Sequence, residues 1–542
     1  MKHPDPEEMD DGVLDHRGEA LPYLSKSAKN MKMDRLLSTP MPNFEGETPG
    51  SYFWTKVIYW ICNRISKIQF RSLEATGMEK IPLDRGSLCC AWHTNGLLDA
   101  LQITLNHPRY FVFGGRHDLV TRPILGWWTR RMAVQPVVRK AELLRGGCSE
   151  EEANFLNGRS LMTLASGISH GYGCVLFPEG TSHNNAYMLR FRTGPMRTVL
   201  AASALAKASG KQLPVLIPIG LHFRTREYFR TDVWVEFSEP IQVHADDVPD
   251  DLVNAVASGT WSEPPAEAVF KLRDSLREKL VPLTPNTHTW DEHRGLLLLG
   301  HIKGRLDKNQ PKSWQDEVVY GRQFRDQFTT KSTTADNESL QPPKLTNPSL
   351  EKSEIAAEIL HRNGLDGRDL NGDATKLLSP RIAKLPLALT RASLFLAFLP
   401  IFIISLLPQM VLGRVLGDST DEGIDARTSY QFLAAMFGSI IIWPISSTII
   451  VALMYWQSGQ ISELIGTEWF ESFGNSSYSV ALAIIMTWLL MFPISFLSGK
   501  LFSFVWDDFV DLRSFYRKQR MSASEKAELF KLIDEIKQDL SS

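Results

Sequence analysis

The sequence has few cysteines, and none has the spacing of a metal-binding or redox pair. There are five, an odd number, and no Cys-x-x-Cys motif occurs. A disulfide framework and a zinc site are therefore not expected. We expect reduced thiols that face a cytosol-like compartment. The cysteines are Cys62, Cys89, Cys90, Cys148 and Cys174.

The sequence also lacks an excess of either charge. It has 59 Lys and Arg against 61 Asp and Glu, a net charge of −2 over 542 residues. A general nucleic-acid binder normally carries a basic excess, so no nucleic-acid partner is expected. No basic n-region followed by an apolar h-region opens the chain, and no signal peptide is predicted.

Long uncharged runs are present in the C-terminal third, at 392–413, 428–462 and 472–499. Each has about 20 apolar-rich positions, the span that a membrane helix needs. Basic residues flank the outer ends of this region but not the loop after the second run, so the positive-inside rule predicts an even number of crossings. The first run contains Pro400 and Pro408 and is expected to form a re-entrant or interfacial hairpin, with three crossings as the alternative.

Residues 73–245 alternate short apolar segments with helical patterns. This alternation predicts an α/β domain with a largely parallel sheet. The strands are expected at 87–92, 109–114, 132–138, 173–177, 213–221 and 231–237.

Composition divides the rest of the chain. A basic amphipathic helix with Trp and Tyr at 51–72 suits the membrane interface; the alternative is a helix packed on the next domain. The expected units are a disordered tail at 1–50, the interfacial helix at 51–72, the α/β domain at 73–245, a helical extension at 246–328, a linker with one short helix at 329–380, a membrane region at 381–500 and a C-terminal soluble helix at 501–542.

His93 and Asp99 are candidate catalytic residues. The histidine follows an apolar strand, and the aspartate lies one to two helical turns later. A carboxylate at this distance can orient the imidazole and leave its other nitrogen free as a general base. A purely structural pair is the alternative, because the two residue types often occur this close together.

Three further segments could bind a ligand. Phe-Pro-Glu-Gly-Thr-Ser at 177–182 follows a strand, and its glycine lets backbone amides approach a ligand. Arg139 ends another strand and suits bidentate phosphate recognition. Arg190 and Arg192 precede a helix that opens at Gly194 and whose amino end could also favour an anion.

In their order and spacing, these segments resemble the four conserved blocks of the glycerolipid acyltransferases. The resemblance covers about residues 75–240 and includes the apolar strand with Pro218. The family's first block usually has four residues between His and Asp; here five intervene, and Leu98 occupies the usual position. His-x-Asn-x-x-x-Asp at 93–99 is similar to the branch of fungal glycerol-3-phosphate/dihydroxyacetone-phosphate acyltransferases.

The resemblance implies catalytic roles for His93 as the base and Asp99 as its orienting partner. It also implies substrate binding by Asn95, Arg139, Glu179, Gly180, Thr181, Arg192 and Pro218. Glu179 would bond acceptor hydroxyls or hold Arg139, because a carboxylate repels a phosphate.

The expected function is that of a membrane-bound O-acyltransferase. It would move a fatty acyl chain from acyl-CoA, or acyl carrier protein, to glycerol 3-phosphate or dihydroxyacetone phosphate, with no metal and no other cofactor. The alternatives are a 1-acylglycerol-3-phosphate (lysophosphatidate) acyltransferase and a non-catalytic lipid-binding membrane protein. The catalytic domain is expected on the cytoplasmic face of a membrane, in contact with lipid.

Overall fold

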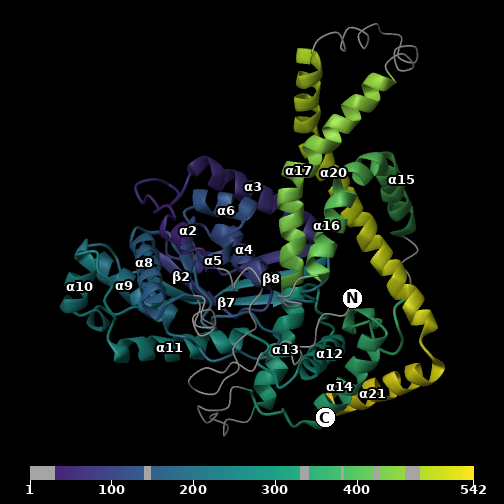
Figure 1. Cartoon of the computed structure of the whole chain (residues 1–542). Coiled ribbons are helices and arrows are strands. Elements are labelled where there is room, and N and C mark those ends of the chain that lie inside the picture. Colours follow the sequence, from purple (N-terminus) through teal and green to yellow (C-terminus); the bar gives the residue numbers. More distant parts are fainter. Residues whose placement is uncertain are drawn as a thin grey trace.

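A seven-stranded, mostly parallel sheet forms the centre of the N-terminal half (Figure 1). The computed structural model describes residues 31–138, 148–329, 341–379, 384–419, 426–457 and 477–541. The strand order is β1-β8-β7-β2-β6-β3, with β9 added to β7, and the only antiparallel pairs in this sheet join β7 to β8 and to β9. The sheet consists of β1 (Phe70–Thr76), β2 (Ser87–Ala91), β3 (Phe111–Val112), β6 (Gly173–Val175), β7 (Val215–Phe223), β8 (Thr231–Phe237) and β9 (Ile241–Gln242).

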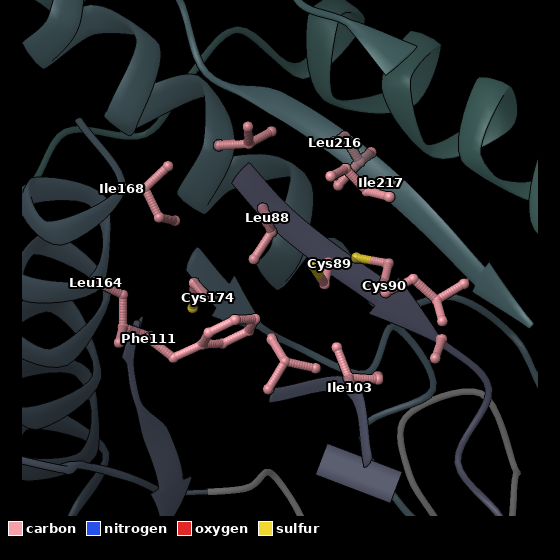
Figure 2. Close-up of a cluster of buried hydrophobic side chains, with 14 of the residues drawn as sticks. Leu88, Cys89, Cys90, Ile103, Phe111, Leu164, Ile168, Cys174, Leu216 and Ile217 are labelled. Carbon is pink, nitrogen blue, oxygen red and sulfur yellow. The ribbon is translucent and has the colours of Figure 1, made fainter. Parts of the chain in front are cut away.

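The sheet is covered by helices, and its central strand β2 is buried at every position. An uninterrupted apolar strand of this kind is typical of a parallel sheet that is covered on both faces. Figure 2 shows side chains of β2, β3, β6 and β7 meeting Ile103 of α4 and Leu164 and Ile168 of α8. Cys62, Cys89, Cys90 and Cys174 are buried free thiols, as expected. The helices around the sheet are α3 (Tyr52–Gln69), α4 (Gly96–Asn106), α5 (His117–Thr121), α6 (Pro123–Arg131), α8 (Glu150–Ser169) and α9 (Gly194–Ala208).

The predicted α/β class is confirmed, but its edges differ from the prediction. The helix expected at 51–72 ends at Gln69, and the chain continues directly into β1, which pairs only with β8 at the sheet edge. An edge strand carries polar residues on its open side, so β1 lacks the apolar run that marks the inner strands. The strand expected at 109–114 is divided between β3 and β4 (Gly114–Arg116), and β4 pairs with β5 (Gln135–Val137) in a separate two-stranded sheet.

The helical extension, predicted at 246–328, includes later parts of the chain as well. Within the segment expected to be a linker, residues 341–379 are folded, and α14 packs against α12 and α21. The buried side chains include Leu350, Ile359, Leu529 and Ile533. The helices of this part are α10 (Asp250–Ala257), α11 (Ala266–Leu280), α12 (Trp290–Leu306), α13 (Trp314–Phe328), α14 (Pro348–Arg362) and α21 (Ala523–Ser541).

Part of the predicted N-terminal tail is also folded. A short helix, α2 (Met33–Leu37), places Leu36 in a small buried cluster with Val138 and Leu156. Residues 1–30 lie outside the described part of the chain.

Three apolar helical segments in the C-terminal part are long enough to cross a membrane: Leu385–Asp418, Arg427–Trp456 and Tyr478–Arg520. The first consists of α15 (Leu385–Ile401), a π-helical turn η7 (Phe402–Leu406) and α16 (Leu407–Asp418), and it bends at this turn (Figure 1). Proline and π-turns are common causes of such bends. The other two segments are α17 (Arg427–Trp456) and α20 (Ser477–Arg520).

Candidate active site

His93 lies at the carboxyl end of β2, where ligands bind in open parallel sheets. Its ring Nδ1 is 2.9 Å from Oδ2 of Asp99, in the first turn of α4. With Nδ1–H donating to the carboxylate, Nε2 carries the free lone pair and can accept a proton. The structure therefore brings together the two residues that the sequence identified as a catalytic pair.

The carboxylate of Asp99 is fully buried and is held by the loop that precedes it. Its Oδ2 also accepts hydrogen bonds from the backbone amides of Thr94 and Asn95, both at 2.8 Å. Gly96, at φ +49°, provides the turn that places these amides around the carboxylate. Leu98, in the usual family position, is buried in the hydrophobic core. The extra residue of the motif is accommodated in this turn, and Asp99 is the partner of His93.

The turn at 177–182 lies beside this pair. The ring of Phe177 stacks on the imidazole of His93, with centroids 3.9 Å apart and an interplanar angle of 8°. Glu179 accepts hydrogen bonds from the backbone amide of His93 at 2.8 Å, the ring Nε2 of His183 at 2.7 Å and the amide of Leu189 at 2.7 Å. These bonds attach the turn to residues 93–99, called the catalytic loop below. The sequence did not assign this role to Glu179.

His183 and Arg226 also support the site, and sequence reasoning missed both roles. The amide of His183 donates to the carbonyl of His93 at 3.0 Å. Arg226, between β7 and β8, donates to the carbonyls of Thr94 and His183, both at 3.1 Å. His183 could have been found from its place four residues after Glu179. Arg226 is far from both motifs in sequence and has no local signal.

The remaining predicted residues occupy different places. Gly180 has φ +75° and forms the turn, where an added Cβ would lie 3.4 Å from Cγ of Arg192. The hydroxyl of Thr181 donates to the carbonyl of Ser182 at 3.3 Å. Pro218 is buried inside β7, opposite Cys90 of β2. Arg139 lies outside the described residues.

Asn95 is buried and faces the second apolar helix. Its Oδ1 accepts a hydrogen bond of 2.6 Å from the hydroxyl of Thr428, on the first turn of α17. A helix predicted to be a membrane segment thus begins against the catalytic loop. Within the described part of the chain, no group of three metal-binding side chains is found.

Comparisons with known proteins find similarity to acyltransferases. The family model described as "Acyltransferase" matches residues 72–221. Glycerol-3-phosphate O-acyltransferase 2 of Saccharomyces cerevisiae is 28% identical over 151 residues, which are 28% of this chain and 19% of the yeast protein. The crystal structure of the 1-acyl-sn-glycerophosphate (LPA) acyltransferase PlsC from Thermotoga maritima is similar over 40% of this chain and 79% of that chain, with 18% identity and a TM-score of 0.27.

The α/β sheet, the His93–Asp99 pair and the family match define an acyltransferase domain at residues 72–221. Residues 72–221 thus match the acyltransferase family, and the chain is similar in sequence to a yeast glycerol-3-phosphate acyltransferase. The matched stretch spans less than a fifth of the yeast relative's length.

Proposed function

We propose that this protein transfers a fatty acyl chain from an acyl thioester, acyl-CoA or acyl-acyl carrier protein, to a hydroxyl of glycerol 3-phosphate or dihydroxyacetone phosphate. The observation that carries the proposal is the 2.9 Å hydrogen bond between His93 and Asp99 inside a domain of the acyltransferase family. The yeast relative acts, by its name, on glycerol 3-phosphate. The product would be an acylated glycerol phosphate, a precursor of phospholipids.

In this mechanism, Nε2 of His93 takes the proton of the acceptor hydroxyl as its oxygen attacks the thioester carbonyl. The tetrahedral intermediate collapses, the C–S bond breaks, and the protonated imidazole returns the proton to the leaving thiolate. Asp99 keeps Nδ1 protonated and stabilises the imidazolium. The thioester is already activated, so no covalent enzyme intermediate is required and positioning supplies much of the rate.

Substrate binding would fall to the residues that the resemblance to the acyltransferases implies. Arg139 and Arg192 would bind the acceptor phosphate, because a guanidinium offers paired donors to phosphate oxygens. Gly180 and Thr181 would contribute to the same site through the turn, and Pro218 would shape the pocket from within β7. Asn95 and Glu179 are buried and already hydrogen-bonded, so they would serve the acceptor site by holding the loop that carries His93. The position of Glu179 beside the backbone of His93 supports a place close to the reacting groups.

An acceptor panel tests the proposal. The purified full chain is incubated with labelled acyl-CoA and, separately, glycerol 3-phosphate, dihydroxyacetone phosphate or lysophosphatidate, with His93→Ala as the control. Labelled monoacyl product from either of the first two acceptors supports the proposal. Product from lysophosphatidate alone would identify the lysophosphatidate reaction instead, and no product from any acceptor would favour a lipid-binding protein.

A further inference from the structure

The first turn of α17 makes direct hydrogen bonds to the catalytic loop, although the two are more than 330 residues apart in sequence. The hydroxyl of Thr428 donates to Oδ1 of Asn95 at 2.6 Å. The hydroxyl oxygen of Ser429 accepts from the amide of Leu97 at 3.0 Å, and the same hydroxyl lies 3.5 Å from the carbonyl of Asn95. Two neighbouring side chains of α17 therefore bond both sides of the turn between His93 and Asp99.

These bonds satisfy groups that nothing else in the described structure satisfies. The amino end of α4 has no side-chain cap of its own, and Ser429 supplies an acceptor for one of its first amides from another helix. The Nδ2 of Asn95 is buried without a partner among the described residues, so the bond from Thr428 is what orients this amide. Asn95 and Thr428 are each 1% exposed, and water has little room to replace the bond.

The rest of the α17 amino end is fixed to the same domain. Phe432 is fully buried and Met436 is 5% exposed, and both belong to the hydrophobic core that contains β2. Met436 also contacts Cys62 of α3, with the two sulfur atoms 3.9 Å apart. Thr428 and Ser429 are thus presented by a rigid element, the kind of support that holds catalytic groups accurately.

We propose that Thr428 and Ser429 are positioning residues of the active site, through which α17 holds the His93–Asp99 pair in its reactive geometry. The proposal rests on the proposed acyl-transfer function for its kinetic test. Asp99 is oriented by the amides of Thr94 and Asn95, so a shift of Asn95 moves the carboxylate and with it the imidazole. The apolar helix that anchors the domain is then also required for its chemistry.

Three variants test this in the full-length protein. Thr428→Val removes the hydroxyl with little change in shape, Thr428→Ser keeps it, and Ser429→Ala removes the acceptor for Leu97. Thr428→Val and Ser429→Ala are expected to lower kcat about 10-fold to 100-fold, the scale of a small misplacement of reacting groups, while the acceptor KM stays within about twofold. Thr428→Ser is expected to restore kcat to within about threefold of wild type.

A matched control lies on the same helix. Thr448 is exposed, and its hydroxyl bonds only to the carbonyl of Pro444 in its own helix. Thr448→Val should therefore leave kcat unchanged. Thermal denaturation accompanies each variant, and if Thr428→Val fails to fold, the comparison of Ser429→Ala with Thr448→Val carries the test.

Hydrogen exchange gives a readout that does not depend on acyl transfer. In Ser429→Ala, the backbone amides of residues 93–99 should exchange faster than in wild type, and in Thr448→Val they should not. Unchanged kcat in both Thr428→Val and Ser429→Ala, an equal loss in Thr448→Val, or a rise in KM with kcat unchanged would overturn the proposal. If wild type transfers no acyl group, the proposed function fails, and the exchange experiment alone decides whether α17 orders the catalytic loop.

Discussion

His93 is held by four residues from two parts of the chain, the first turn of α4 and the segment at 177–183. Asp99 binds its ring, Phe177 stacks on the ring, Glu179 accepts from its amide, and His183 donates to its carbonyl. A histidine with both its ring and its backbone fixed loses little entropy when a substrate arrives, so the site is preorganised for proton transfer.

Replacing His93 by Ala should remove most turnover without unfolding the protein. The expected loss is about 10²-fold to 10⁴-fold, the usual contribution of a general acid–base catalyst. Asp99→Asn should reduce the rate less, because the base and the activated thioester both remain. Steady-state kinetics on protein with a wild-type denaturation midpoint measure the effect, and near-normal turnover in folded His93→Ala protein would refute the mechanism.

Glu179→Gln tests the structural role of the turn. The amide presents N–H donors where three donors from His93, His183 and Leu189 now meet a carboxylate, so at least one bond is lost. The expected cost is about 1–3 kcal/mol of unfolding free energy, together with a lower kcat. Denaturation and kinetics are measured beside Glu278→Gln, an exposed control on α11. Equal stability of the two variants would mean that the carboxylate does not hold the loop.

At the scale of whole elements, both ends of the bent segment Leu385–Asp418 form ion pairs with the other two apolar helices. Arg391 near its start pairs with Asp508 of α20 at 3.1 Å, and Asp418 at its end pairs with Arg427 of α17 at 2.8 Å. Its bend contacts the middle of α17, where the hydroxyl of Ser446 donates to the carbonyl of Ile404 at 2.6 Å. We propose that this segment is the re-entrant or interfacial hairpin expected from the charge pattern and the prolines.

The longest helix supports the same topology. α20 has 44 residues and would measure about 66 Å, twice the hydrocarbon thickness of a bilayer. Its C-terminal part bonds to folded domains instead: Asp507 pairs with Arg230, and Lys518 pairs with Asp369 at 2.6 Å. We propose that the catalytic domain, the start of α17 and the end of α20 lie on one side of the membrane, the cytoplasmic side.

Labelling of single cysteines in a cysteine-free background tests this topology. Cysteines placed at Ser419 and Ser524, both exposed in the structure, should be protected from an impermeant reagent in intact cells. One placed at Gly466, outside the described residues, should react. Permeabilised cells serve as the control, in which all three positions should label. Reaction at Ser419 and Ser524 but not at Gly466 in intact cells would indicate three crossings from a cytoplasmic catalytic domain. Reaction at Ser524 but not at Ser419 would also contradict the proposed topology.

At the scale of the whole molecule, a buried ionic network joins the catalytic sheet to the helical extension. Arg224 bonds to Asp232 of β8 at 2.7 Å and to both carboxylate oxygens of Glu317 of α13, and Glu317 also bonds to His301 of α12 at 3.0 Å. Burial by itself would raise the pKa of Glu317, but the Arg224 guanidinium and the His301 ring outweigh it and lower that pKa to about 2.

This network predicts a loss of stability in acid. Because the pKa of Glu317 is about 2 in the folded state and 4.5 ordinarily, its contribution is complete above pH 4.5 and is lost as the pH falls toward 2. The shift corresponds to about 3 kcal/mol. Denaturation midpoints measured across this range should fall less steeply for Glu317→Gln than for wild type. Glu278→Gln should keep the wild-type slope, and equal slopes in all three proteins would contradict the assignment.

Local sequence was sufficient to predict the class of the fold, the candidate His93–Asp99 pair and the apolar segments. Buried parallel strands and long apolar helices are recorded in local composition, and His93 and Asp99 are close enough in the chain for the helix between them to join them. The motif order was sufficient to predict an acyltransferase domain, and the family model matches residues 72–221.

The surroundings of the His93–Asp99 pair, and the contacts between the α/β domain and the helices, depend on tertiary packing. No local sequence pattern predicts four of these features. They are the edge strand β1, the packing of residues 341–379, the bonds of Arg226 to the catalytic loop and the contact of Thr428 with Asn95. Each depends on residues brought together from distant parts of the chain, and a polar side chain carries no sign in sequence of which buried group it will satisfy. The partner is set by the packing of the helices and the sheet, because a buried polar group must find its hydrogen bond among whatever neighbours that packing supplies.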